Sequence, residues 1–176
     1  MTQLLGQLSI VLVKMSYKIV ITPSSFGKVS DSALSLLKKH FTKIKINDSG
    51  VKISREEVVN FYSNANYAIA GLETLDRENL ERLPNLKIIS RVGIGLDNID
   101  LDYAKSKNIS IEITRNGLTN SVAEYTLSLI LNVLKGIHQS NTLLKKGIWQ
   151  KSMGREISEC NIGIVGAGNI GQKLLD

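Results

Sequence analysis

Short apolar runs alternate with stretches of helical spacing over the first two thirds of the chain. Five runs predict strands, because each is short, rich in β-branched or small apolar residues, and bounded by turn-forming residues. These strands cover residues 17–22, 43–46, 67–70, 86–90 and 109–114. Helical spacing predicts helices over residues 31–40, 54–64, 76–83 and 100–107, the first capped by Ser30 or Asp31. Strands and helices that alternate with short connections predict a parallel sheet with helices on its faces.

From Ser121 to about Lys146 the pattern changes to one long helix whose apolar residues cover nearly its whole circumference. A helix of this kind has to be covered on all sides, so we expect it to lie between domains or between subunits. Ser121 and Glu124 form an S-x-x-E capping box, which predicts that the helix begins there. Residues 116–120, just before it, are interpreted either as a turn with a helix cap or as a hinge.

A glycine-rich loop follows a further predicted strand at residues 161–165. Gly166, Gly168 and Gly171 form the pattern G-x-G-x-x-G. In dinucleotide-binding units the first glycine permits a tight turn, the second admits the pyrophosphate, and the third lets the next helix pack closely. A helix from Asn169 would offer free N–H groups to the phosphates. The acidic residue that distinguishes NAD from NADP is expected about 20 residues further on, so both cofactors stay open.

A second loop with two glycines follows the fourth predicted strand. Ligands of open parallel sheets bind at the carboxyl ends of the strands, where this loop would lie. Gly93 and Gly95 would let successive N–H groups turn inward as an anion-binding nest, with Arg91 as a positive partner. A small carboxylate would suit that nest. The alternative is a plain strand-to-helix connection with Asp97 or Asn98 as the helix cap, and the pattern alone does not decide between the two.

Composition narrows the classes of function. The net charge is +6, but the lysines are scattered without interleaved aromatic residues, which favours a solvated surface over nucleic-acid binding. The single cysteine, Cys160, indicates a reducing compartment. Neither His40 nor His138 has a catalytic context, and no metal-binding motif is found, so no metal is expected. The apolar stretch within residues 1–14 is too short for a membrane span and lacks the features of a signal peptide.

The start of the chain has two interpretations. Met15 directly precedes the first predicted strand, so residues 1–14 are interpreted as an N-terminal extension. The competing interpretation is an N-terminal arm that packs on a partner.

Three segments, in this order, resemble the D-isomer-specific 2-hydroxyacid dehydrogenase family, and most closely its D-3-phosphoglycerate dehydrogenase-like members. They are residues 84–100, 121–126 and 163–171. The resemblance implies that residues 15–118 form the first part of a flavodoxin-like substrate domain. It implies that residues 119–176 begin a Rossmann-type NAD-binding domain, with a long interface helix and the first strand and helix. Family dimers pack through that helix, so a homodimer through the helix from Ser121 to Lys146 is expected.

The resemblance also implies roles for individual residues. The backbone at Val92, Gly93 and Ile94 would hold the substrate carboxylate, beside Arg91, and Val122 would lie near the nicotinamide. The residues that would surround the pyrophosphate of NAD are Gly166, Gly168, Asn169, Ile170 and Gly171.

Family chemistry is NAD-dependent hydride transfer between 2-hydroxy and 2-oxo acids, with 3-phosphoglycerate as one candidate substrate. The Arg, Glu and His that carry it out in the family are expected beyond Asp176. We therefore expect residues 1–176 to be inactive by themselves, in a protein of the cytoplasm. The alternative is a non-catalytic binding or regulatory protein on the same scaffold.

Overall fold

The computed structural model describes residues 15–115 and 117–176. The chain divides into two compact units between Arg115 and Asn116. The expected N-terminal extension, residues 1–14, lies outside the described residues. One residue of the possible hinge, Asn116, also lies outside them.

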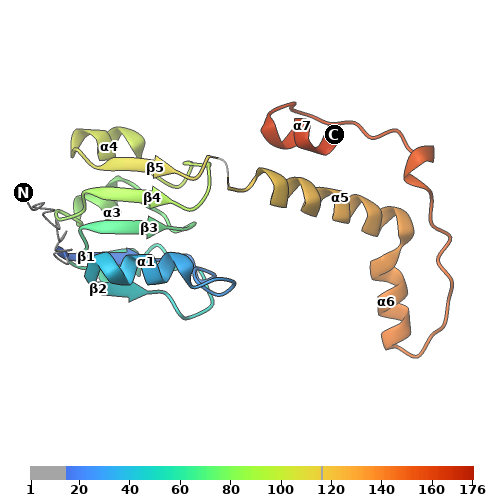
Figure 1. Cartoon of the computed structure of the whole chain (residues 1–176), viewed down its shortest axis with the longest axis horizontal. Coiled ribbons are helices and arrows are strands. Elements are labelled where there is room, and N and C mark those ends of the chain that lie inside the picture. The colour runs from blue at the N-terminus through green and yellow to red at the C-terminus, as the bar shows by residue number, and fades with distance from the viewer. Residues whose placement is uncertain (1–14, 116) are drawn as a thin grey trace, which may run out of the picture. The chain divides into compact units, whose positions relative to one another are not determined.

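The first unit is built on a five-stranded, fully parallel sheet in the order β2-β1-β3-β4-β5 (Figure 1). The strands are β1 (Met15–Ile21), β2 (Phe41–Ile46), β3 (Tyr67–Ala70), β4 (Ile88–Arg91) and β5 (Ser110–Ile113). This is the flavodoxin-like strand order, so the predicted α/β fold class is confirmed. Each of the five strands predicted for this unit is present, with its ends shifted by at most two residues.

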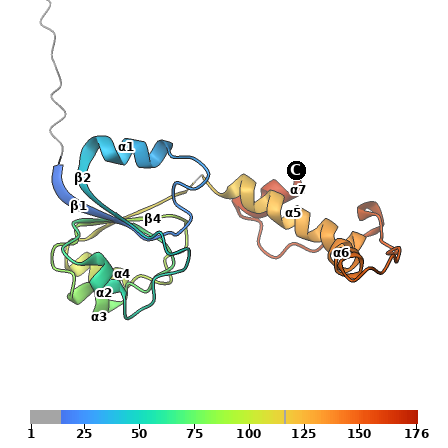
Figure 2. The ribbon, with the colours of Figure 1, turned by 90° about the horizontal axis from the view of Figure 1, so that it is seen from below.

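The helices of the first unit cover the two faces of the sheet unequally. Helix α1 (Ser32–His40) lies on one face, and three helices lie on the other face (Figure 2). These are α2 (Val58–Tyr62), α3 (Arg77–Glu81) and α4 (Leu101–Ser106). The chain runs outward from β1 to β2 and then returns to add β3, β4 and β5 on the other side of β1. The reversal between β1 and β3 is the switch point at which open α/β sheets bind ligands.

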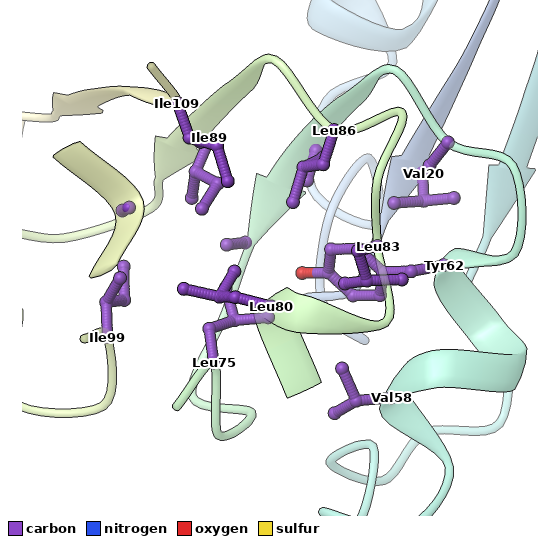
Figure 3. Packing of buried hydrophobic residues seen from close by; sticks show 14 of the residues in the cluster. Val20, Val58, Tyr62, Leu75, Leu80, Leu83, Leu86, Ile89, Ile99 and Ile109 are labelled. Carbon is purple, nitrogen blue, oxygen red and sulfur yellow. The ribbon is translucent and has the colours of Figure 1, made fainter. Parts of the chain in front are cut away.

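The hydrophobic core lies between the sheet and the layer formed by α2, α3 and α4 (Figure 3). Successive strand residues point to opposite faces, so Ala68, Ala70 and Ile89 face this core while Ile88 stays 38% exposed on the other face. Tyr62 and Leu75 are fully buried beside them. Burying a large apolar side chain stabilises the fold by about 1.5–3 kcal/mol, so this layer carries most of the packing energy of the sheet.

The second unit is mostly helical and departs from the prediction in its first half. It contains α5 (Thr119–Lys135), α6 (Ile137–Lys145), the short 3-10 helix η1 (Ile157–Glu159) and α7 (Asn169–Leu175). The prediction of one helix up to Lys146 is wrong, because Gly136 adopts a left-handed conformation with φ of 60° and ends α5. The capping-box prediction is also wrong. The helix begins at Thr119, so Ser121 and Glu124 already lie inside it.

The predicted strand at residues 161–165 is wrong as well. No strand is assigned there, and Val165 is fully exposed. A strand exists only through hydrogen bonds to a neighbouring strand, and residues 117–176 contain no strand that could pair with it. The helix predicted from Asn169 is present as α7, which contacts α5. Among the described residues, no helix combines the length and the apolar character that crossing a bilayer requires.

Candidate functional site

A pocket of about 310 Å³ lies at the carboxyl ends of β1, β3 and β4, beside the switch point of the sheet. Its walls come from the connections that follow β1, β2, β3 and β4. The polar residues that line it include Thr22, Ser24, Lys52, Glu73 and Arg91. The pocket therefore lies where the parallel topology predicts a ligand site.

Arg91 ends β4 and turns its side chain toward the buried face of the sheet, so that the residue is only 8% exposed. Its Nη1 donates a hydrogen bond to the carbonyl oxygen of Val92, while its Nε has no partner in the described part of the chain. Gly93 has φ of 140°, and a Cβ added there would lie 2.9 Å from Nη1 of Arg91. This φ is strained for any residue that carries a Cβ, so the loop favours glycine at this position.

The loop above this guanidinium group is anchored on both sides. The N–H of Val92 donates to the carbonyl oxygen of Ala70 at 2.9 Å, and the carbonyl oxygen of Gly93 accepts from the N–H of Thr114 at 3.1 Å. Within residues 15–115, the N–H groups of Gly93 and Ile94 have no acceptor. Two free donors beside a buried cation form a local environment that suits an anion. The structure thus brings together Arg91, Gly93 and Ile94, whereas the N–H of Val92 is already used.

The alternative that Asp97 or Asn98 caps the next helix is wrong. The N-cap of α4 is Asp100, whose carboxylate accepts a hydrogen bond from the N–H of Tyr103 at 2.9 Å. Asn98 instead donates from Nδ2 to the carbonyl oxygen of Glu73 at 2.6 Å. The loop after β4 is thereby tied to the loop after β3, which is another wall of the pocket.

Glu73 is a buried polar residue of the pocket wall that the sequence reasoning missed. It is 1% exposed, and its Oε1 accepts from the hydroxyl of Tyr62 and from Oγ1 of Thr22 at 2.6 Å. Its Oε2 accepts from the N–H of Gly71 at 3.0 Å. Burial raises the pKa of Tyr62 well above its usual value, and the nearby Glu73 raises it further. An acidic residue three positions after a buried strand was the available signal in the sequence.

In the second unit, the glycine-rich loop has the geometry that two of its glycines were expected to provide. Gly166 has φ of 94°, and a Cβ added at Gly171 would overlap the carbonyl oxygen of Gly166. Gly168 has open space around it, and Asn169 and Ile170 open α7 directly after it. Val122 lies in the first turns of α5 and is 37% exposed. The described residues contain no cluster of His, Cys, Asp and Glu that could hold a metal ion.

Comparison with protein families gives one match over most of the chain. The family described as "D-isomer specific 2-hydroxyacid dehydrogenase, catalytic domain" matches residues 19–169. A Staphylococcus epidermidis protein whose name assigns it to the 2-hydroxyacid dehydrogenases is 36% identical over 152 residues, covering 82% of this chain and 47% of that protein. The D-3-phosphoglycerate dehydrogenase of Archaeoglobus fulgidus is 30% identical over 146 residues, covering 81% of this chain and 27% of that protein.

Solved structures share the fold. The NAD+-bound 3-phosphoglycerate dehydrogenase of Entamoeba histolytica matches with a TM-score of 0.71 at 24% sequence identity, covering 92% of this chain and 50% of that chain. At that identity the match supports the fold alone. The chain spans about half the length, or less, of the relatives that it matches.

Proposed function

Since the chain belongs to the D-isomer specific 2-hydroxyacid dehydrogenase family, we propose that it supplies the first half of an NAD-dependent oxidoreductase that interconverts 2-hydroxy and 2-oxo acids. Residues 15–118 are the first part of the substrate domain, and residues 119–176 begin the NAD-binding domain. Relatives named as acting on phosphoglycerate make 3-phosphoglycerate a candidate substrate.

The observation that carries the proposal is the loop over the Arg91 guanidinium group. The free N–H groups of Gly93 and Ile94 would donate to the two oxygens of a substrate carboxylate, whereas the N–H of Val92 is held by the carbonyl oxygen of Ala70 and adds no donor. The buried positive charge of Arg91 would stabilise the bound anion, because its attraction is less screened than that of a surface charge. The substrate is then a small acid whose reacting carbon lies next to this carboxylate.

The glycine-rich loop of the second unit fits a dinucleotide. Gly168 has open space at the position where the pyrophosphate would approach the backbone, while Gly166 and Gly171 hold the turn. In this proposal Asn169 and Ile170 complete the pyrophosphate site and Val122 lies near the nicotinamide. The bound cofactor would supply or accept the hydride, and the residues present leave NAD and NADP both open.

We propose that the Arg, Glu and His of the family's chemistry lie beyond Asp176, so that residues 1–176 bind ligands without turnover. Incubation of the purified chain with NADH and a series of 2-oxo acids should give no consumption of NADH above background. Consumption above background would contradict this part of the proposal.

Assembly and location complete the proposal. Exposed apolar residues of α5, among them Tyr125 and Val133, would be covered by a second copy of the chain. The single cysteine, Cys160, fits the reducing environment of the cytoplasm.

Substrate binding is tested by proton–nitrogen correlation NMR on the full chain with D-lactate as the probe. The amide signals of Gly93 and Ile94 should shift in a saturable way. Gly93→Ala should abolish the shifts, because φ of 140° is strained for any residue with a Cβ, and the added Cβ would also displace the guanidinium group of Arg91. Gly95→Ala is the control, because a Cβ at Gly95 makes only ordinary contacts, the nearest at 3.6 Å from Asp97. Unchanged signals at Gly93 and Ile94 at saturating lactate would contradict the substrate site.

A further inference from the structure

We propose that Asn98 is a positioning residue for the carboxylate site. Its side-chain amide holds the loop after β4 in the conformation that presents the free N–H groups of Gly93 and Ile94. This inference rests on the proposed function, because those two groups would bind the carboxylate of the substrate. Asn98 acts only through the backbone of the loop, so it is not a catalytic residue.

The middle of the loop after β4 has few hydrogen bonds of its own. The carbonyl oxygen of Gly93 accepts from the N–H of Thr114, and the loop ends at Asn98. Within residues 15–115, the N–H groups of residues 94–97 donate to no acceptor, although the side chain of Leu96 packs partly against the hydrophobic core. The conformation of this backbone therefore depends on how its two ends are held.

The loop after β4 pairs with the loop after β3 at two separate points of the main chain. The N–H of Val92 donates to the carbonyl oxygen of Ala70 at 2.9 Å. Further along, the N–H of Leu75 donates to the carbonyl oxygen of Asn98 at 2.8 Å. Between these two points, the main chains of the two loops share no hydrogen bond in the described part of the first unit.

The side-chain amide of Asn98 joins the two loops within this interval. Its Nδ2 donates to the carbonyl oxygen of Glu73 at 2.6 Å and makes a longer contact, of 3.5 Å, with the carbonyl oxygen of Gly71. Both acceptor residues line the pocket. The amide is available for this contact because Asp100, and not Asn98, caps α4. It thus extends the attachment of the loop from Leu75 to the wall of the ligand site.

Glu73 is itself held in place, which makes it an ordered partner for the amide. It is 1% exposed, and its carboxylate accepts hydrogen bonds from Thr22 after β1, from Tyr62 of α2 and from the N–H of Gly71. These contacts restrict the backbone that carries its carbonyl oxygen. A contact with an ordered group requires little further loss of conformational entropy. Asn98 therefore fixes the carboxylate loop relative to a part of the wall that is already ordered.

The test compares Asn98→Ala with Asn79→Ala on the full chain. The Nδ2 of Asn79 also donates to two carbonyl oxygens, those of Arg55 and Thr74, but neither residue belongs to the loop after β4. Asn79 is 4% exposed, whereas Asn98 is only partly buried. The control variant should therefore lose at least as much stability as Asn98→Ala. Urea unfolding measures stability, and NMR titration with D-lactate measures affinity.

We expect Asn98→Ala to bind D-lactate about fivefold more weakly than the wild type, the equivalent of roughly 1 kcal/mol. The amide signals of Gly93 and Ile94 should also be displaced in the free variant. Asn79→Ala should keep the wild-type affinity despite its loss of stability. Asn98→Leu keeps a side chain of similar size without the donor, so it should weaken binding as Asn98→Ala does.

The outcomes separate this inference from the proposed function. Wild-type affinity in Asn98→Ala and Asn98→Leu, or an equal loss in Asn79→Ala, would overturn the positioning role while the carboxylate site stands. A wild type that binds no lactate overturns the proposed function, and amide hydrogen exchange of the free proteins then decides the positioning role. Exchange at Val92 and Thr114, whose N–H groups anchor the loop, should be faster in Asn98→Ala than in Asn79→Ala. Equal exchange in these two variants would overturn it.

Discussion

The hydroxyl of Tyr62 donates a hydrogen bond to Oε1 of Glu73, and neither residue is more than 1% exposed. The same carboxylate accepts from Thr22, just after β1, and from Gly71, just after β3. One side chain therefore ties α2 to the two strand ends that border the pocket. The arrangement is buried beside the switch point of the sheet, where a shift of either loop would change the shape of the ligand site.

Replacing Tyr62 by Phe should destabilise the protein by about 1–3 kcal/mol, because it removes a donor from a buried charged acceptor. The matched control is Tyr103→Phe. The hydroxyl of Tyr103 is also buried but has no partner in the described part of the chain, so its loss should be neutral or slightly stabilising. Urea unfolding of both variants measures the difference. Similar decreases in the free energy of unfolding of the two variants would show that the hydrogen bond to Glu73 makes no specific contribution to stability.

The same pair predicts how stability changes at alkaline pH. Burial, followed by the charge of Glu73, raises the pKa of Tyr62 above its usual value of about 10. The neutral hydroxyl therefore stabilises the folded state below about pH 10, and this contribution is lost as the pH rises toward the higher folded-state pKa. The advantage of the wild type over Tyr62→Phe should shrink above about pH 10, by up to roughly 1.4 kcal/mol per pH unit. A difference that stays constant with pH would contradict this cause.

Two helix N-caps of the first unit give a second matched pair. The carboxylate of Asp76 accepts from the N–H of Asn79 at 3.0 Å at the start of α3, whereas Asp31 at the start of α1 makes no cap hydrogen bond. Asp76→Ala should therefore cost about 1 kcal/mol at neutral pH, and Asp31→Ala much less.

The stability difference between the wild type and Asp76→Ala should become smaller at acid pH. The hydrogen bond from Asn79, aided by Arg55, lowers the pKa of Asp76. Its contribution is present above the unfolded-state pKa of about 4 and is lost as the pH falls through the lower folded-state value. When unfolding is measured from neutral to acid pH, the free energies of unfolding of the Asp76→Ala variant and of the wild type should converge. Equal costs for the two alanine variants at neutral pH would contradict the capping assignment.

The sequence predicted the first unit well because its signals are local. Each strand has its own apolar run and turn, and the parallel order follows from short βα connections, as the segment Tyr67–Ala70 illustrates with bounds that agree fully. The loop over Arg91 was also predicted, because Gly93 and Gly95 mark it in the sequence. What could not be predicted there depends on side chains brought together by folding. Glu73 gains its partners from residues 11 and 51 positions away.

The second unit shows where local signals fail. The apolar pattern continues past Gly136, but the pattern carries no information on φ, and the left-handed glycine ends the helix. The run at residues 161–165 has the composition of a strand, yet a strand also needs a neighbour, which residues 117–176 do not contain. The roles of Val122 and of the glycine-rich loop in cofactor binding remain predictions.

Helix α5 should mediate self-association. Val133 is 81% exposed and Tyr125 is 65% exposed on this helix, and exposed apolar side chains that gather on one element mark a surface for association. Val133→Glu should shift the particle mass measured by light scattering toward the monomer value of 19.4 kDa. Leu36→Glu is the control, because Leu36 is 56% exposed on α1 of the first unit. A monomeric wild type, or dissociation by both variants alike, would contradict a dimer through α5.

Replacement of Gly168 and replacement of Gly171, two residues of the glycine-rich loop, should have different effects on the fold of the loop. A Cβ at Gly171 would overlap the carbonyl oxygen of Gly166, so Gly171→Ala has to displace the turn itself. A Cβ at Gly168 meets nothing within 4 Å, so Gly168→Ala should leave the fold of the loop intact. Amide hydrogen exchange over residues 166–175 should therefore rise in Gly171→Ala and stay at the wild-type level in Gly168→Ala.

Titration with NAD+ distinguishes a glycine that maintains the fold of this loop from a glycine that contacts the cofactor. If the open space at Gly168 receives the pyrophosphate, Gly168→Ala should lose the NAD+-induced shifts of Asn169 and Ile170 although its exchange is normal, because the methyl group occupies the space of the phosphate oxygens. Gly171→Ala should lose both the protection and the shifts, because its loop is displaced. Wild-type NAD+ shifts in Gly168→Ala would place the dinucleotide elsewhere on the unit and leave Gly166 and Gly171 with a purely structural role.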